Sequence, residues 1–114
     1  MASLDRSLVK TLELACQGQR AEQIVRGREL VGEYIASVGI EAVERHAYDC
    51  LRLDDVRAFR RLADIYSLHS REALKRLVDF GLASKNPMVV QAARGFVTAT
   101  REDPANGTQP FGSG

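Results

Sequence analysis

Apolar residues recur every three to four positions along almost the whole of this chain, which is the spacing that places them on one face of an α-helix. Interruptions divide the pattern into six stretches, and most of them carry residues that begin or end helices. We expect helices over about residues 3–18, 20–38, 40–51, 54–66, 70–82 and 86–100. The predicted fold class is therefore all-α, a small bundle of about five to six helices with no substantial sheet.

Capping residues support these boundaries. The side chains of Ser3, Asp54 and Ser70 can accept hydrogen bonds from the free backbone amides in the first turn of a helix. Asn86-Pro87 adds a proline, whose fixed backbone suits the first helical position. Gly39 is placed to end the second helix.

The second expected helix combines a broad apolar stripe with two glycines. Gly27 and Gly32 lower its stability as a helix, each by up to about 1 kcal/mol relative to alanine. The same glycines would allow a neighbouring helix to approach its backbone closely. The stripe expected to face the core consists of Ile24, Leu30, Val31, Tyr34 and Ile35.

The last four expected helices contain a degenerate internal repeat. A shift of 31 positions aligns Glu41–Val43 with Glu72–Leu74, and Arg45 with Arg76. Each copy is a helix, a short polar link and a second helix, and it resembles the helical hairpin of HEAT-like repeats, in which neighbouring hairpins stack over a shared core. The resemblance implies two such hairpins after an N-terminal helix pair. The alternative is an irregular bundle, because amphipathic helices align easily and solenoids usually need about three repeats.

The length of 114 residues suits one domain, and the composition, with 45% apolar and 27% charged residues, is that of an ordinary globular protein. Residues 104–114 contain several glycines and prolines and have no apolar periodicity. We therefore expect a single helical domain over residues 1–103, followed by a disordered C-terminal tail over residues 104–114.

Membrane and export signals are missing from the pattern. No window approaches the roughly 18 apolar residues that span a bilayer, and the first residues lack the basic start and apolar run of a secretion signal. Cys16 and Cys50 lie far apart on apolar helix faces and have no metal-binding spacing. We therefore expect a cytoplasmic protein whose reduced thiols pack as small hydrophobes.

Few residues are suited to catalysis or to cofactor binding. The histidines are His46, which could touch Cys50 one helical turn away, and His69, which is expected in a turn between helices. A Cys–His pair at this spacing has no glycine-rich turn beside it to stabilise an oxyanion. The common spacings of zinc, calcium and phosphate sites do not occur. We expect no enzyme, no metal and no cofactor, and a small hydrolase or transferase using His46 is the least favoured alternative.

The net charge of +1 is unevenly distributed along the chain. Residues 1–55 contain seven Lys/Arg and ten Asp/Glu, a net charge of −3, whereas residues 56–101 contain nine and three, a net charge of +6. A basic half of this kind commonly meets an acidic partner, although it is equally compatible with helices that are merely solvated. The candidate contact residues are the basic residues of the fourth and fifth expected helices, Arg57, Arg60, Arg61, Arg71, Lys75 and Arg76.

Residues 60–82 also resemble a helix-turn-helix, with a turn over Ser67–Ser70. The second helix of such a motif would present Arg71, Lys75 and Arg76 to the major groove of DNA. Its last residues are similar to the end of the recognition helix in winged-helix regulators, but the wing would require strands where Asn86-Pro87 predicts a helix.

Two interpretations of function follow. The leading one is a noncatalytic adaptor or regulatory domain that binds a partner protein with an acidic surface through the basic C-terminal half. The alternative is a helix-turn-helix transcriptional regulator that binds DNA, as a homodimer because half-sites are normally read in pairs.

Overall fold

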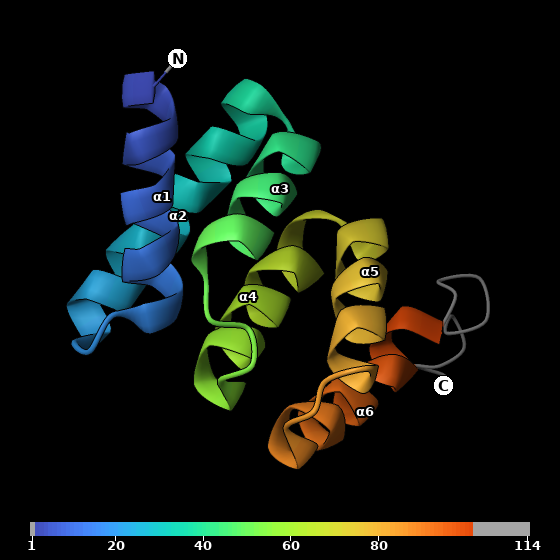
Figure 1. Cartoon of the computed structure of the whole chain (residues 1–114). Coiled ribbons are helices and arrows are strands. Elements are labelled where there is room, and N and C mark those ends of the chain that lie inside the picture. Colours follow the sequence, from blue (N-terminus) through green and yellow to red (C-terminus); the bar gives the residue numbers. More distant parts are fainter. Residues whose placement is uncertain (1, 102–114) are drawn as a thin grey trace.

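The computed structural model describes residues 2–101 and, within that range, the side chains of residues 6–97. These residues form six α-helices and no strand, which confirms the predicted all-α fold class (Figure 1). The helices are α1 (Ala2–Gln17), α2 (Ala21–Val38), α3 (Ile40–Cys50), α4 (Val56–His69), α5 (Arg71–Leu82) and α6 (Pro87–Arg101). The expected tail over residues 104–114 lies outside the described part of the chain.

Three of the predicted helix ends are confirmed. Gly39 separates α2 from α3 with a φ of 94°, a conformation that glycine adopts without strain. Ser70 caps α5, since its Oγ accepts a 3.1 Å hydrogen bond from the backbone N of Ala73. Asn86 caps α6, since its Oδ1 accepts a 3.0 Å hydrogen bond from the backbone N of Met88.

Two helix starts differ from the prediction. The residue before α4 is Asp55 rather than Asp54, and its side chain makes no capping hydrogen bond. Asp54 instead offers its backbone carbonyl, which accepts a 2.7 Å hydrogen bond from Nδ2 of Asn86 and so ties the α3–α4 connection to the start of α6. The first helix begins at Ala2, so Ser3 lies within it.

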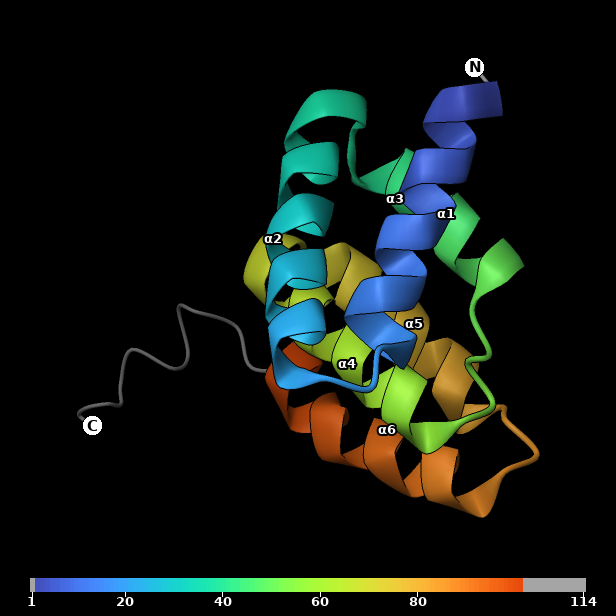
Figure 2. The ribbon, with the colours of Figure 1, turned by 90° about the vertical axis from the view of Figure 1, so that its left-hand side faces the viewer.

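The helices form three successive layers, α1–α2, α3–α4 and α5–α6, which run from left to right in Figure 1. In the first and last layers the two helices pack along each other. The central helix is α4, which contacts α1 and α2 as well as α5 and α6 and lies between α1–α2 and α6 in Figure 2.

Burial follows this arrangement. The central helix α4 contributes fully buried side chains to the core, among them Phe59, Leu62 and Tyr66. At the edge of the bundle, α2 buries only Gly27 and Val31. The rest of its expected core stripe is only half-buried: Ile24, Leu30, Tyr34 and Ile35. The predicted inward face of α2 is therefore correct, but its side chains are less buried than expected.

Two glycines set very close helix contacts. A Cβ at Gly27 of α2 would lie 2.6 Å from the backbone N of Ala15 in α1, so the close approach expected for this glycine is confirmed. A Cβ at Gly81 of α5 would lie 2.6 Å from the ring of Phe59 and 2.9 Å from Cβ of Ala93. Both glycines are required where they stand, because any larger residue would push the helices apart.

The predicted repeat is present only in part. As two stacked hairpins require, α3 contacts α5 and α4 contacts α6. The α5–α6 hairpin is closed, whereas α3 and α4 do not pack along each other. Their connection carries Leu51 and Leu53 into the core, and α1 packs against both α3 and α4. The domain is therefore a layered bundle with one closed hairpin in its C-terminal half rather than two.

Candidate protein-binding groove

Helices α4 and α6 lie side by side and run in the same direction (Figure 2). Their starts are joined by the 2.7 Å hydrogen bond between Asn86 and the carbonyl of Asp54. Further along, Arg60 and Asp64 of α4 face residues 91–96 of α6. Because equivalent turns of the two helices stay opposite each other, their outer surfaces form one continuous face.

A groove open to solvent runs between these outer surfaces. It has a volume of about 370 Å³ and is lined by Arg60, Asp64, Gln91, Ala92, Gly95 and Phe96. Residues three and four positions apart share a helix face, which extends the stripe to Arg57 and Leu68 on α4 and to Met88 on α6. We call these nine residues the α4–α6 groove. From Arg57 to Leu68 it measures about 17 Å at a rise of 1.5 Å per residue.

Apolar side chains of the groove are strongly exposed. Leu68 is 70% exposed and Met88 is 60% exposed, the two highest values among the large hydrophobic side chains that the structure describes. Ala92 is buried and Phe96 is half-buried, so they form the floor. Because the two helices run in the same direction, Met88 lies near the start of the groove and Leu68 near its end, with the half-buried Phe96 between them along the groove.

Gly95 has empty space above it. It is exposed, and a Cβ built on it would meet no atom of the described residues within 4 Å apart from its chain neighbours and the adjacent backbone of its own helix. A glycine inside a helix costs about 1 kcal/mol relative to alanine. Gly27 and Gly81 allow close helix contacts, but no contact of the described residues requires a glycine at position 95. Among the described residues, nothing occupies the space beside Gly95.

Two of the predicted contact residues lie together in this groove. Arg57 and Arg60 are exposed on the same face of α4, and within the described residues neither forms an ion pair or a hydrogen bond. Asp64 follows one turn after Arg60 and places a carboxylate in the same groove. The groove is therefore basic toward the start of α4 and mixed toward its end.

Two other predicted contact residues have partners inside the domain. Arg61 donates from Nη1 to the backbone carbonyls of Gly18 over 2.7 Å and of Cys16 over 3.3 Å, which satisfies free carbonyls at the end of α1. Arg76 donates two hydrogen bonds of 2.8 Å to the carboxylate of Glu44. Arg61 thus joins α4 to α1, and Arg76 joins α5 to α3.

Glu44 is a buried acid that the sequence analysis did not identify. Its side chain is 9% exposed, whereas the side chain of Arg76 is 53% exposed. The hydrogen bonds to Glu44 raise the pKa of Arg76. Burial, and then the charge of Glu44, raises the pKa of the neighbouring Tyr48 to about 12. The partner of Glu44 lies 32 residues away on another helix, so no local pattern marks the pair.

The last two predicted contact residues, Arg71 and Lys75, are exposed on α5 and do not line the groove. Leu74 and Leu77 on the same helix are buried, as the helix-turn-helix interpretation expected. The six predicted residues therefore form no single surface: two lie in the groove, two on α5, and two join helices.

The turn expected for the helix-turn-helix is wrong. Helix α4 continues through Ser67 to His69, so Ser70 alone separates it from α5. A helix-turn-helix uses a turn of about three to four residues to set the angle between its helices. Residues 87–101 form α6, so the strands of a wing are absent from this part of the described chain.

The cysteines and histidines form no evident catalytic centre. Cys16 is buried and Cys50 half-buried, and both are free thiols. Burial raises the pKa of Cys16 to about 12 and that of Cys50 to about 11, so both stay protonated, and weakly nucleophilic, near neutral pH. Nδ1 of His46 lies 2.8 Å from the carbonyl oxygen of Ala42. His69 is exposed, as expected for a solvated residue, but it ends α4 rather than lying in a turn.

Neither the remaining chemistry of the described residues nor the comparisons with known proteins indicate a function. In the described residues, no group of three or more His, Cys, Asp or Glu side chains could hold a metal ion. None of the helices described above combines the length and the apolar composition that crossing a membrane requires. The chain matches no protein-family model, no curated protein and no solved structure.

Proposed function

We propose that this domain is a noncatalytic adaptor or regulatory module that binds a partner protein through the α4–α6 groove. The observation that carries the proposal is Gly95, which no described residue covers and which lines the groove beside Arg60 and Phe96. The exposed Leu68 and Met88 extend this face, and among the described residues Arg57 and Arg60 form no ion pair. The free thiols of Cys16 and Cys50 fit a reducing compartment such as the cytoplasm.

An amphipathic helix is the partner element that fits this groove. Helices that dock into grooves present apolar residues at positions i, i+3, i+4 and i+7, which span about the length from Met88 to Phe96 on α6. Leu68 and Met88 would pack against such a stripe, and the missing Cβ at Gly95 would let the partner's backbone approach closely.

The charge of the groove defines the partner further. Arg57 and Arg60 would pair with acidic residues beside the apolar stripe of the partner helix. Pairs of this kind at the rim of an interface mainly speed association and fix orientation, whereas the apolar contacts supply most of the affinity. The partner is therefore expected to carry acidic residues next to its apolar anchors.

Matched charge reversals test this assignment. The full chain is immobilised as wild type, as Arg57→Glu/Arg60→Glu and as Arg71→Glu/Lys75→Glu, and is exposed to lysate of the source cells. Proteins retained by the wild type are identified, purified and titrated against all three baits. We expect the groove variant to weaken binding at least about tenfold and the α5 variant to change it about twofold or less.

Equal binding by the wild type and the groove variant would contradict the proposal, and selective loss with the α5 variant would move the site to α5. A second copy of the same chain is a possible captured partner. Light scattering of the purified wild type detects such self-association, and the groove variant shows whether the groove mediates it.

Duplex DNA binding through α5 predicts a different result. A DNA-binding domain releases counterions on binding, so its affinity for duplex falls steeply with salt. We expect only weak binding to random duplex at physiological salt. Tight, sequence-selective binding that is lost in Arg71→Ala/Lys75→Ala/Arg76→Ala would instead support the helix-turn-helix alternative.

A further inference from the structure

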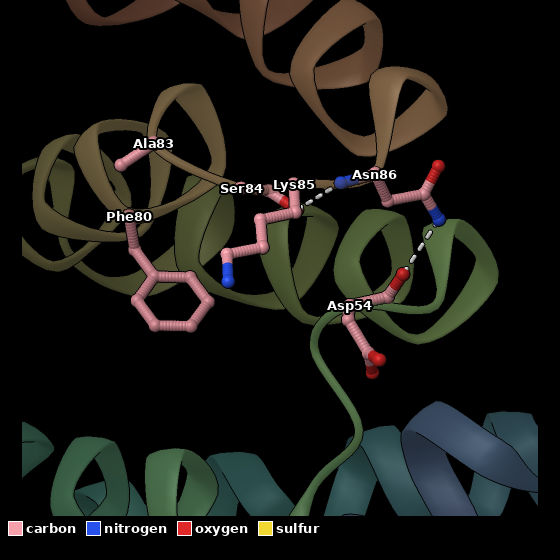
Figure 3. A pocket seen from close by; sticks show the side chains of 6 residues that line it. All are labelled: Asp54, Phe80, Ala83, Ser84, Lys85 and Asn86. Atoms are coloured by element: carbon pink, nitrogen blue, oxygen red, sulfur yellow. Dashed lines mark hydrogen bonds between the residues drawn. The ribbon is translucent and has the colours of Figure 1, made fainter.

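A second hollow lies where α5 ends and α6 begins (Figure 3). It has a volume of about 580 Å³ and is lined by Asp54, Phe80, Ala83, Ser84, Lys85 and Asn86. None of these residues lines the α4–α6 groove. The hollow is therefore a surface separate from the groove.

An aromatic side chain forms one wall of the hollow. The ring of Phe80 packs against Tyr48 of α3, with 5.2 Å between the ring centroids and an angle of 54° between the planes. Phe80 is nevertheless 46% exposed. The contact with Tyr48 holds the ring in place and leaves much of it available to an apolar group of a ligand.

Opposite charges lie beside this ring. In Figure 3 the side chains of Phe80, Lys85 and Asp54 project to the same side of the α5–α6 connection. Within the described residues, neither the ammonium of Lys85 nor the carboxylate of Asp54 forms a hydrogen bond or an ion pair. A ligand with one negative and one positive group complements both charges, whereas a ligand with two like charges is repelled by one of them.

The backbone around the hollow is held by hydrogen bonds. Oγ of Ser84 accepts a 3.0 Å hydrogen bond from the backbone N of Asn86. The side chain of Asn86 joins Asp54 to the start of α6, through the 2.7 Å bond to the Asp54 carbonyl and the 3.0 Å bond from the Met88 amide. Lys85 and Asp54 are thus attached to a connected backbone, which fixes where their exposed side chains begin.

We propose that this hollow binds a short peptide segment that carries a large apolar side chain between an acidic and a basic one. The apolar side chain packs on Phe80, the acidic side chain pairs with Lys85, and the basic side chain pairs with Asp54. A peptide supplies all three groups on one backbone, and the volume lies within the range of small-ligand sites.

Charge-matched peptides test the proposal. Four heptapeptides with blocked ends contain a central phenylalanine between glycine spacers. In three of them the phenylalanine lies between two charged residues, which are one acidic and one basic, two acidic, or two basic. The fourth peptide carries no charged residue. Each is titrated into the isotope-labelled full chain by NMR, at low salt. We expect the wild type to prefer the acid–base peptide by roughly fivefold over the other three. The shifted resonances should lie at residues 80–86 and 54.

Single substitutions should redirect this preference. Asp54→Lys should favour the acid–acid peptide, and Lys85→Glu should favour the base–base peptide, because each makes both sides of the hollow alike in charge. Phe80→Ala should weaken all four peptides roughly tenfold. The control Leu68→Ala removes an apolar side chain that is 70% exposed in the groove and should change nothing.

The result that overturns the proposal is an unchanged order of peptides in Asp54→Lys and Lys85→Glu, or the absence of resonance shifts at residues 80–86. The uncharged groove substitution Gly95→Gln should leave these titrations unchanged. The same variant should weaken binding of the captured partner protein. The two measurements therefore distinguish a wrong assignment of this hollow from a wrong assignment of the groove.

Discussion

Helix α5 and the α4–α6 groove both contain glycine and arginine, but these residues have close neighbours on α5 and none among the described residues in the groove. On α5, Gly81 is pressed against Phe59 and Ala93, and Arg76 holds the buried carboxylate of Glu44. In the groove, no described residue from another part of the chain lies within 4 Å of a Cβ built at Gly95, and among the same residues Arg57 and Arg60 form no ion pair or hydrogen bond.

The difference separates structural residues from available ones. A glycine or an arginine with a neighbour that requires it contributes to the fold, so its substitution is expected to lower stability. Substitution of a glycine or an arginine without such a neighbour is expected to affect binding instead. We therefore expect substitutions of the first kind to lower the unfolding temperature and substitutions of the second kind to affect recognition without lowering it.

The largest effect is expected from Gly81→Ala. The added methyl would lie within 3 Å of the Phe59 ring and of Cβ of Ala93, and both are buried in the core. Overpacking of this kind lowers the free energy of unfolding by about 1–3 kcal/mol. Chemical denaturation of the purified variant measures the loss. Unchanged stability would show that α5 and α6 are less tightly joined than the geometry indicates.

The next effect is expected from Arg76→Met, compared with Arg60→Met. Arg76→Met removes the guanidinium and leaves the carboxylate of Glu44 buried and unpaired. This should lower the unfolding temperature by roughly 5–10 °C. The matched variant Arg60→Met removes an exposed charge and should change it by about 2 °C or less. The double variant Arg76→Met/Glu44→Met should recover much of the loss. Similar effects of the two single variants would contradict the distinction between the two regions.

The fold was accessible from the sequence because its determinants are local. Apolar spacing and capping side chains fix where each helix runs, and Ser70, Asn86 and Gly39 act where they were expected. The missing second hairpin depends on distant parts of the chain. The burial of Leu53 and the packing of α1 against α3 and α4 keep the second layer from closing into a hairpin.

The candidate site could be predicted from the sequence only in part, because its missed contacts also join distant parts of the chain. The basic residues of the C-terminal half were visible as a charge pattern, but their partners were not. Arg61 reaches α1, and Arg76 reaches Glu44, across separations that no periodicity reveals. Like Gly27 and Gly32, Gly95 stood in the sequence as a glycine inside an expected helix, and only the structure separates the packed Gly27 from Gly95, which no described residue covers.

The smallest effect on stability is expected from Gly95→Ala. A Cβ at this position meets nothing, and alanine is the better helix former, so the free energy of unfolding should rise by about 0.5–1 kcal/mol. Chemical denaturation under the conditions used for Gly81→Ala checks this opposite sign. A loss of stability would mean that the space above Gly95 is filled in solution.

Binding by Gly95→Gln tests the central claim most directly. Glutamine is a good helix former and its side chain would fill the middle of the groove while the fold stays intact. The account predicts that this variant unfolds at a temperature no lower than the wild type, yet binds the captured partner protein at least about tenfold more weakly. Equal affinity of the wild type and Gly95→Gln for that partner, with both chains folded, would contradict the assignment of the α4–α6 groove as the binding site.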